Sequence, residues 1–132
     1  MMEDILKKLE KDTTGMDTYE YIVNHTDTCF DELPRLIENL KRADLTGQFL
    51  ASTARFLHAV DAEKFDPFLE QIIGAAIERD KERKYIGILL EALWGPDYEE
   101  KAGQLQKDND SFRRIYKRLY PEKSIDNKGH LI

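Results

Sequence analysis

Residues 65–77 read Phe-Asp-Pro-Phe-Leu-Glu-Gln-Ile-Ile-Gly-Ala-Ala-Ile. Apolar side chains recur here at intervals of three and four residues, which places them on one stripe of a helix: Phe65, Phe68, Leu69, Ile72, Ile73, Ala76 and Ile77. Asp61 precedes the stretch and can cap its first turn by accepting a hydrogen bond from an exposed backbone N–H. The pattern therefore predicts a helix over 62–80.

The same spacing recurs along most of the chain, and no clean run of period-two alternation interrupts it. It predicts a series of helices joined by short connections, which makes neighbours antiparallel: 3–12, 17–26, 30–42, 45–60, 62–80, 82–94, 97–107 and 110–120. Asp17 and Asp97 each stand three residues before a Glu, the spacing of a capping box. We expect a single all-α domain of seven to eight antiparallel helices over 1–120, followed by a polar C-terminal tail over 121–132.

Two architectures fit this series of helices. At an offset of 35 residues, Phe30 and Asp31 align with Phe65 and Asp66, and Leu33 aligns with Phe68. An offset of this length is typical of helical-repeat stacks. The signature residues of HEAT and tetratricopeptide repeats are missing, so the sequence leaves open both a helical bundle and a short HEAT/TPR-like stack of helical hairpins.

The composition is that of one folded domain. Of 132 residues, 41% are hydrophobic, enough to bury a core, yet the longest apolar run, 72–77, is far shorter than a membrane span. Cys29 is the single cysteine, so no intramolecular disulfide can form. The acids Glu3 and Asp4 stand where a signal peptide carries bases. We expect a cytoplasmic protein with no membrane partner.

Residues able to support catalysis or metal binding are few. His25 and Cys29 stand four residues apart, so they share a helix face, but a closed zinc site needs two more soft ligands. The other histidines are His58 and His130, and no glycine-rich phosphate loop occurs. We expect no metal, no cofactor and no catalytic residue. An uncharacterised enzyme that uses Cys29 and His25 is the enzymatic alternative.

The helix expected over 110–120 carries the clearest candidate partner-binding face. Phe112, Ile115 and Leu119 lie on its apolar side, and the remaining surface is basic with one aromatic ring: Arg113, Arg114, Lys117, Arg118 and Tyr120. Such a face can contact a phosphate backbone, an anionic membrane or an acidic protein surface. The same cations also offset the helix macrodipole, which is an interpretation that requires no partner.

Charge is unevenly distributed along the chain. The net charge is −6 overall, and residues 1–70 hold 15 acids and 8 bases, or −7. We therefore expect a non-enzymatic protein-interaction module, a small cytoplasmic adaptor, regulator or immunity-type protein. Its acidic N-terminal half, or the groove between stacked hairpins, would contact a basic partner. A nucleic-acid-associated regulator that uses 110–120 is the alternative, although the net charge disfavours nucleic acid. The wide apolar faces of 45–60 and 82–94 also allow a homodimer.

Overall fold

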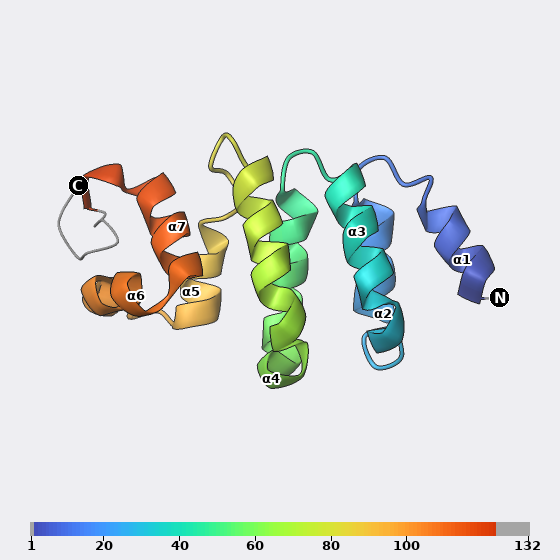
Figure 1. The fold of residues 1–132 in the computed structure, drawn as a ribbon, viewed down its shortest axis with the longest axis horizontal. Helices are drawn as coiled ribbons and strands as arrows, with labels where there is room; N and C mark the ends of the chain where they lie inside the picture. Colours follow the sequence, from blue (N-terminus) through green and yellow to red (C-terminus); the bar gives the residue numbers. More distant parts are fainter. Residues whose placement is uncertain (1, 124–132) are drawn as a thin grey trace.

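Helical hairpins stand side by side in a row (Figure 1). The protein is described by a computed structural model over residues 2–123. Within these residues the structure is helical and contains no strand, so the all-α prediction is confirmed. The elements are α1 (Met2–Leu9), α2 (Met16–Asn24), α3 (Leu33–Ala43), α4 (Gln48–Arg79), α5 (Ile88–Trp94), α6 (Ala102–Asp108) and α7 (Asp110–Leu119), with short 3-10 turns at Phe30–Glu32, Tyr98–Lys101 and Pro121–Lys123. The rest of the expected tail, 124–132, lies outside the described residues.

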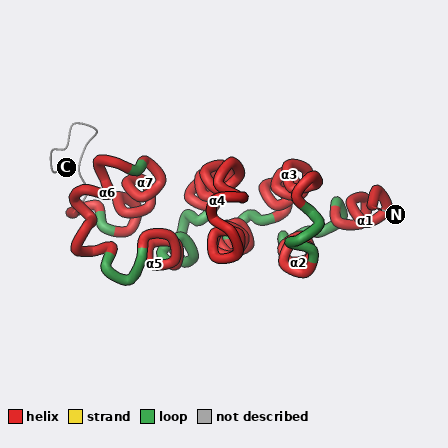
Figure 2. Tube along the Cα trace, turned by 90° about the horizontal axis from the view of Figure 1, so that it is seen from below, coloured by secondary structure: helices red, strands yellow, loops and turns green. Residues whose placement is uncertain are grey.

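The hairpins form two layers. Helix α4 bends back on itself at Asp61, whose backbone is non-helical (φ −165°, ψ 87°), so its two halves make the central hairpin. The hairpin of α2 and α3 packs on one side of α4, and α5 and α7 pack on the other. Figure 2 shows α3 and α7 in one layer and α2 and α5 in the other, with α4 contributing to both. This arrangement is a short stack in which each hairpin contacts its neighbours.

The apolar stripes identified in the sequence form the core. Of the stripe in the second half of α4, Phe65, Leu69 and Ile72 are buried, while Phe68 is half-buried. Phe112 and Ile115 of α7 are fully buried against this layer. Removing a side chain of this size from water stabilises a fold by roughly 1.5–3 kcal/mol.

A buried aspartate organises the turn before each hairpin. Asp12, Asp44 and Asp80 precede α2, α4 and α5, and their exposed fractions are 4%, 1% and 1%. In each case the carboxylate accepts a hydrogen bond from the backbone N–H six residues later: Thr18 at 2.9 Å, Leu50 at 2.7 Å and Ile86 at 2.8 Å. The carboxylates thus satisfy N–H groups that would otherwise lack partners at the starts of these helices.

Successive turns also pack directly on one another. The third residue after each aspartate has a positive φ: Gly15 at 95°, Gly47 at 84° and Arg83 at 59°. A Cβ on Gly15 would lie 3.0 Å from the Cβ of Asp44, and one on Gly47 would lie 3.1 Å from the backbone nitrogen of Asp80. Each glycine therefore provides both the left-handed conformation and the space for the next turn.

These turns correct several helix boundaries. The helix expected over 82–94 begins only at Ile88, and the one expected over 45–60 begins at Gln48. The carboxylate of Asp80 accepts from the N–H groups of Lys84, Tyr85 and Ile86. These hydrogen bonds hold residues 80–86 in a turn, so the helix cannot begin there.

The expected capping boxes are wrong as well. Helix α2 begins at Met16, with Gly15 at the N-cap position and no side-chain cap, so Asp17 lies inside the helix; Asp12 instead accepts from the N–H groups of Gly15 and Thr18. Asp97 precedes the 3-10 turn Tyr98–Lys101 and its side chain makes no cap hydrogen bond. Asp61, by contrast, accepts from Lys64 N–H at 3.1 Å, as expected of a cap.

Asp12 makes the fold sensitive to acid. Burial by itself raises the pKa of Asp12, but the hydrogen bonds from Thr18, Thr14 and Gly15 outweigh it and leave the pKa below its ordinary value. The carboxylate therefore stabilises the fold fully above its unfolded-state pKa of about 3.9, and this stabilisation is lost as the pH falls through the lower folded-state pKa. We expect Asp12→Asn to reduce the free energy of unfolding at pH 7, with a gap to the wild type that shrinks below pH ~4. Urea denaturation across this range measures the gap, and a gap that does not change with pH would contradict the expectation.

Candidate functional site: an acidic groove beside Trp94

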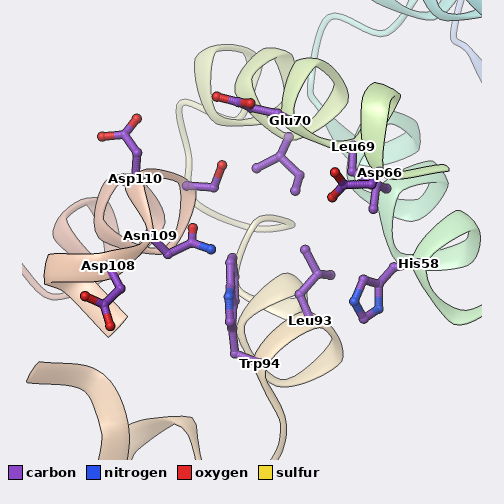
Figure 3. A pocket seen from close by; sticks show the side chains of 11 residues that line it. His58, Asp66, Leu69, Glu70, Leu93, Trp94, Asp108, Asn109 and Asp110 are labelled. Carbon is purple, nitrogen blue, oxygen red and sulfur yellow. The ribbon is translucent and has the colours of Figure 1, made fainter. Parts of the chain in front are cut away.

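A groove of about 330 Å³ lies between α4, mainly its second half, and the ends of α5 and α6 and the start of α7. Its lining contains four carboxylates and no Lys or Arg. We call it the acidic groove; it is lined by His58, Asp66, Leu69, Glu70, Ile73, Leu93, Trp94, Asp108, Asn109, Asp110 and Ser111. In Figure 3, Trp94 stands in the middle, with His58 and Asp66 on one side and Asp108, Asn109 and Asp110 on the other.

Helix α4 supplies one wall. Asp66 and Glu70 are four residues apart, so they project from one face of the helix toward the groove, and both are exposed. Within residues 2–123 neither carboxylate has an ion pair or a hydrogen bond. These two acids therefore carry uncompensated negative charge into the groove.

The junction of α6 and α7 supplies the opposite wall. Asn109 breaks the helix with an extended backbone (φ −133°, ψ 113°), and its side-chain oxygen accepts from Phe112 N–H at 2.9 Å, which caps α7. Asp108 and Asp110 flank this break at the edge of the groove. Asp108 accepts from the Gln104 amide at 2.9 Å, and Asp110 pairs with Arg113, so this wall is less negative than the α4 wall.

Trp94 and three aliphatic side chains form the apolar part of the groove. Helix α5 ends at Trp94, the end expected of the helix over 82–94, because Gly95 follows with φ 94°. The indole ring packs edge-on against Phe112, with ring centroids 5.1 Å apart at 85°, and remains half-buried. Beside it lie Leu69, Ile73 and Leu93.

Carboxylates around an indole ring and an aliphatic surface suit the side chains of arginine and lysine. A guanidinium or ammonium group can pair with the carboxylates and lie over the aromatic face. The methylene stem of the same side chain can cover the aliphatic surface. The acidic groove thus complements both the charged group and the methylene stem of a long basic side chain.

The basic residues expected on 110–120 do not form one open surface. Only Lys117 is exposed; Arg113 pairs with Asp110, and Arg114 lies beside Gly74 of α4. Tyr120 is half-buried, with its ring 5.1 Å from that of Tyr116.

Arg118 has a role that recurs along the stack. It donates to the carbonyl of Ile77 near the end of α4 at 2.9 Å. Arg79 donates in the same way to Lys41 of α3 at 2.9 Å, and Arg42 to Glu10 at the end of α1 at 2.7 Å. A guanidinium near the end of each of these helices therefore caps the end of a helix earlier in the chain, where the macrodipole is negative. This contact places Arg118 within the stack rather than on a free face.

Cys29 and His25 lie in different environments. Cys29 is fully buried, and burial raises the pKa of its thiol, with Glu32 nearby adding to the shift. His25 is exposed, and its ring stacks on Tyr21 at a centroid distance of 4.1 Å. Among residues 2–123, no group of three His, Cys, Asp or Glu side chains is arranged to hold a metal ion.

Comparisons with known proteins show no family for this chain. The chain matches no known family model, no curated protein and no solved structure. In the described part of the chain, no helix combines the length and the apolar character needed to cross a bilayer.

Sequence reasoning missed the acidic groove and the repeated turn for different reasons. The turn has a visible signal, since Asp12-Thr-Thr-Gly15 and Asp44-Leu-Thr-Gly47 share a pattern at a spacing of 32 residues. The groove has none, because its walls come from segments far apart in the chain. His58 in particular looked isolated in the sequence, yet it lies in the groove with Asp66.

Proposed function

We propose that this protein is a non-enzymatic protein-interaction module whose acidic groove binds a basic segment of a partner protein. The observation that carries the proposal is the lining of the groove: four carboxylates, two of them without a partner among the described residues, around Trp94. A stack of hairpins suits this role because it holds such a surface on rigid helices.

Two further observations favour this function over the alternatives. A nucleophilic cysteine needs a lowered pKa and access to substrate, whereas Cys29 is buried and its pKa is raised. A nucleic-acid-binding face needs free cations, whereas Arg113 and Arg118 are engaged within the chain. Cys29, Arg113 and Arg118 all lie outside the lining of the acidic groove.

The single tryptophan makes binding directly measurable, because Trp94 lies in the groove itself. The probe is a short glycine-spaced peptide with two arginines, compared with the same peptide carrying neutral citrulline in their place. We expect the arginine peptide to change the Trp94 fluorescence in a saturable, salt-sensitive way, since exposed ion pairs weaken as the ionic strength rises. Equal changes with both peptides would contradict the proposal.

A pair of matched variants tests the location. Asp66→Ala with Glu70→Ala removes the two unpartnered carboxylates, and we expect the affinity for the arginine peptide to fall about tenfold. Glu63→Ala with Glu78→Ala is the control, because it changes the net charge equally at exposed positions of α4 outside the groove. If the control loses as much affinity as the groove variant, overall charge rather than the groove is responsible. The same variants as baits then show which cellular protein depends on the groove.

A further inference from the structure

A second groove lies in the other layer of the stack, between the first half of α4 and α5. It has a volume of about 610 Å³, and it is lined by Arg55 and Ala59 from α4 and by Ile88, Glu91 and Ala92 from α5, with Tyr98 at one end. We call it the α4–α5 groove. It shares no lining residue with the acidic groove.

Two of the large apolar side chains that the described residues expose lie in the α4–α5 groove or next to it in the chain. Ile88 is 40% exposed, and Val60, which follows Ala59 at the end of the first half of α4, is 50% exposed. Ile88 and Ala92 are four residues apart on α5, so they project side by side. Exposed apolar side chains gathered in this way are typical of a surface that another molecule covers.

The groove carries one charge of each sign. Arg55 comes from α4 and Glu91 from α5, both exposed, and neither side chain has an ion pair or hydrogen bond among residues 2–123. A partner of a single sign would leave one of the two charges unpaired. A second copy related by a two-fold axis can pair both, in the orientation that sets Arg55 of each copy opposite Glu91 of the other, because two-fold symmetry makes that contact reciprocal.

We propose that two copies of this chain associate through the α4–α5 groove. Ile88, Ala92 and Ala59 form the apolar centre of the contact, and Arg55 and Glu91 form two reciprocal ion pairs at its edges. This proposal is independent of the basic partner of the acidic groove, because the two surfaces use different residues.

The reciprocal pairing gives a direct test by sedimentation velocity over a range of concentrations. We expect the wild type to dimerise, and Arg55→Glu and Glu91→Arg each to weaken dimerisation by at least about tenfold, since each places like charges opposite one another. An equimolar mixture of the two variants restores both pairs: the two substituted side chains face one another at one edge, and the native Arg55 and Glu91 face one another at the other. We therefore expect the mixture to form heterodimers at wild-type strength.

Each result decides the proposal. A wild type that stays monomeric up to about 1 mM overturns it. A wild-type dimer that neither variant weakens, or variants that the mixture does not rescue, place the contact elsewhere and also overturn it. Lys107→Glu and Glu63→Lys are matched charge-reversal controls at exposed positions outside the groove, and we expect them to dimerise like the wild type. Circular dichroism of every variant shows that the helices are intact.

Discussion

Asp44→Ala is expected to lower the free energy of unfolding by about 3 kcal/mol. The carboxylate accepts from Gly47 N–H at 3.0 Å and from Leu50 N–H at 2.7 Å, both in a buried setting. Alanine leaves both donors without an acceptor and out of reach of water, and each buried unsatisfied group costs roughly 1–3 kcal/mol. Urea denaturation followed by circular dichroism measures the loss.

Asp61→Ala is the matched control. Asp61 also caps a helix start, accepting from Lys64 N–H at 3.1 Å, but it is exposed, so water can replace the lost acceptor. We expect a loss of about 1 kcal/mol or less. Equal losses for the two variants would show that burial of the aspartate turn adds nothing to the stability of the stack.

Gly47→Ala is the second substitution with a large expected effect, again about 3 kcal/mol of destabilisation. The backbone of Gly47 has φ 84°, which costs a residue with a Cβ roughly 1–2 kcal/mol. The added Cβ would also lie 3.0 Å from the carbonyl oxygen of Ala76 and 3.1 Å from the nitrogen of Asp80. Those two atoms are joined by the 2.9 Å hydrogen bond that ends α4, so neither can move freely.

Gly103→Ala provides the comparison for this second case. Gly103 lies in α6, is exposed, and has no heavy atom within 4 Å of the position of an added Cβ. Alanine is the better helix former, so we expect no loss and a gain of up to about 1 kcal/mol. Thermal unfolding of both variants measures the difference, and a Gly47→Ala protein as stable as Gly103→Ala would refute the close packing of successive turns.

Features that depend on residues close together in the sequence could be predicted, and features that depend on residues far apart in the sequence could not. The stripe from Phe65 to Ile77 and the end of the helix expected over 82–94 depend on neighbours within a few residues, so periodicity and conformational preference predict them. Helices α4 and α5 begin later than expected because Asp44 and Asp80 accept from N–H groups as far as six residues ahead. The role of Arg118 depends on a carbonyl 41 positions away, which no local pattern reveals.

The sequence by itself determined that this protein is helical, which faces of its helices are apolar, and that its net charge is negative, because these properties follow from composition and from periods of three to four residues. Only the tertiary structure decided where the charges are free. It pairs Arg113 with Asp110, turns Arg118 toward α4, and leaves Asp66 and Glu70 without a partner among residues 2–123, opposite Asp108. The physical reason is that a groove is a property of two separate segments brought together. Neither segment contains it alone.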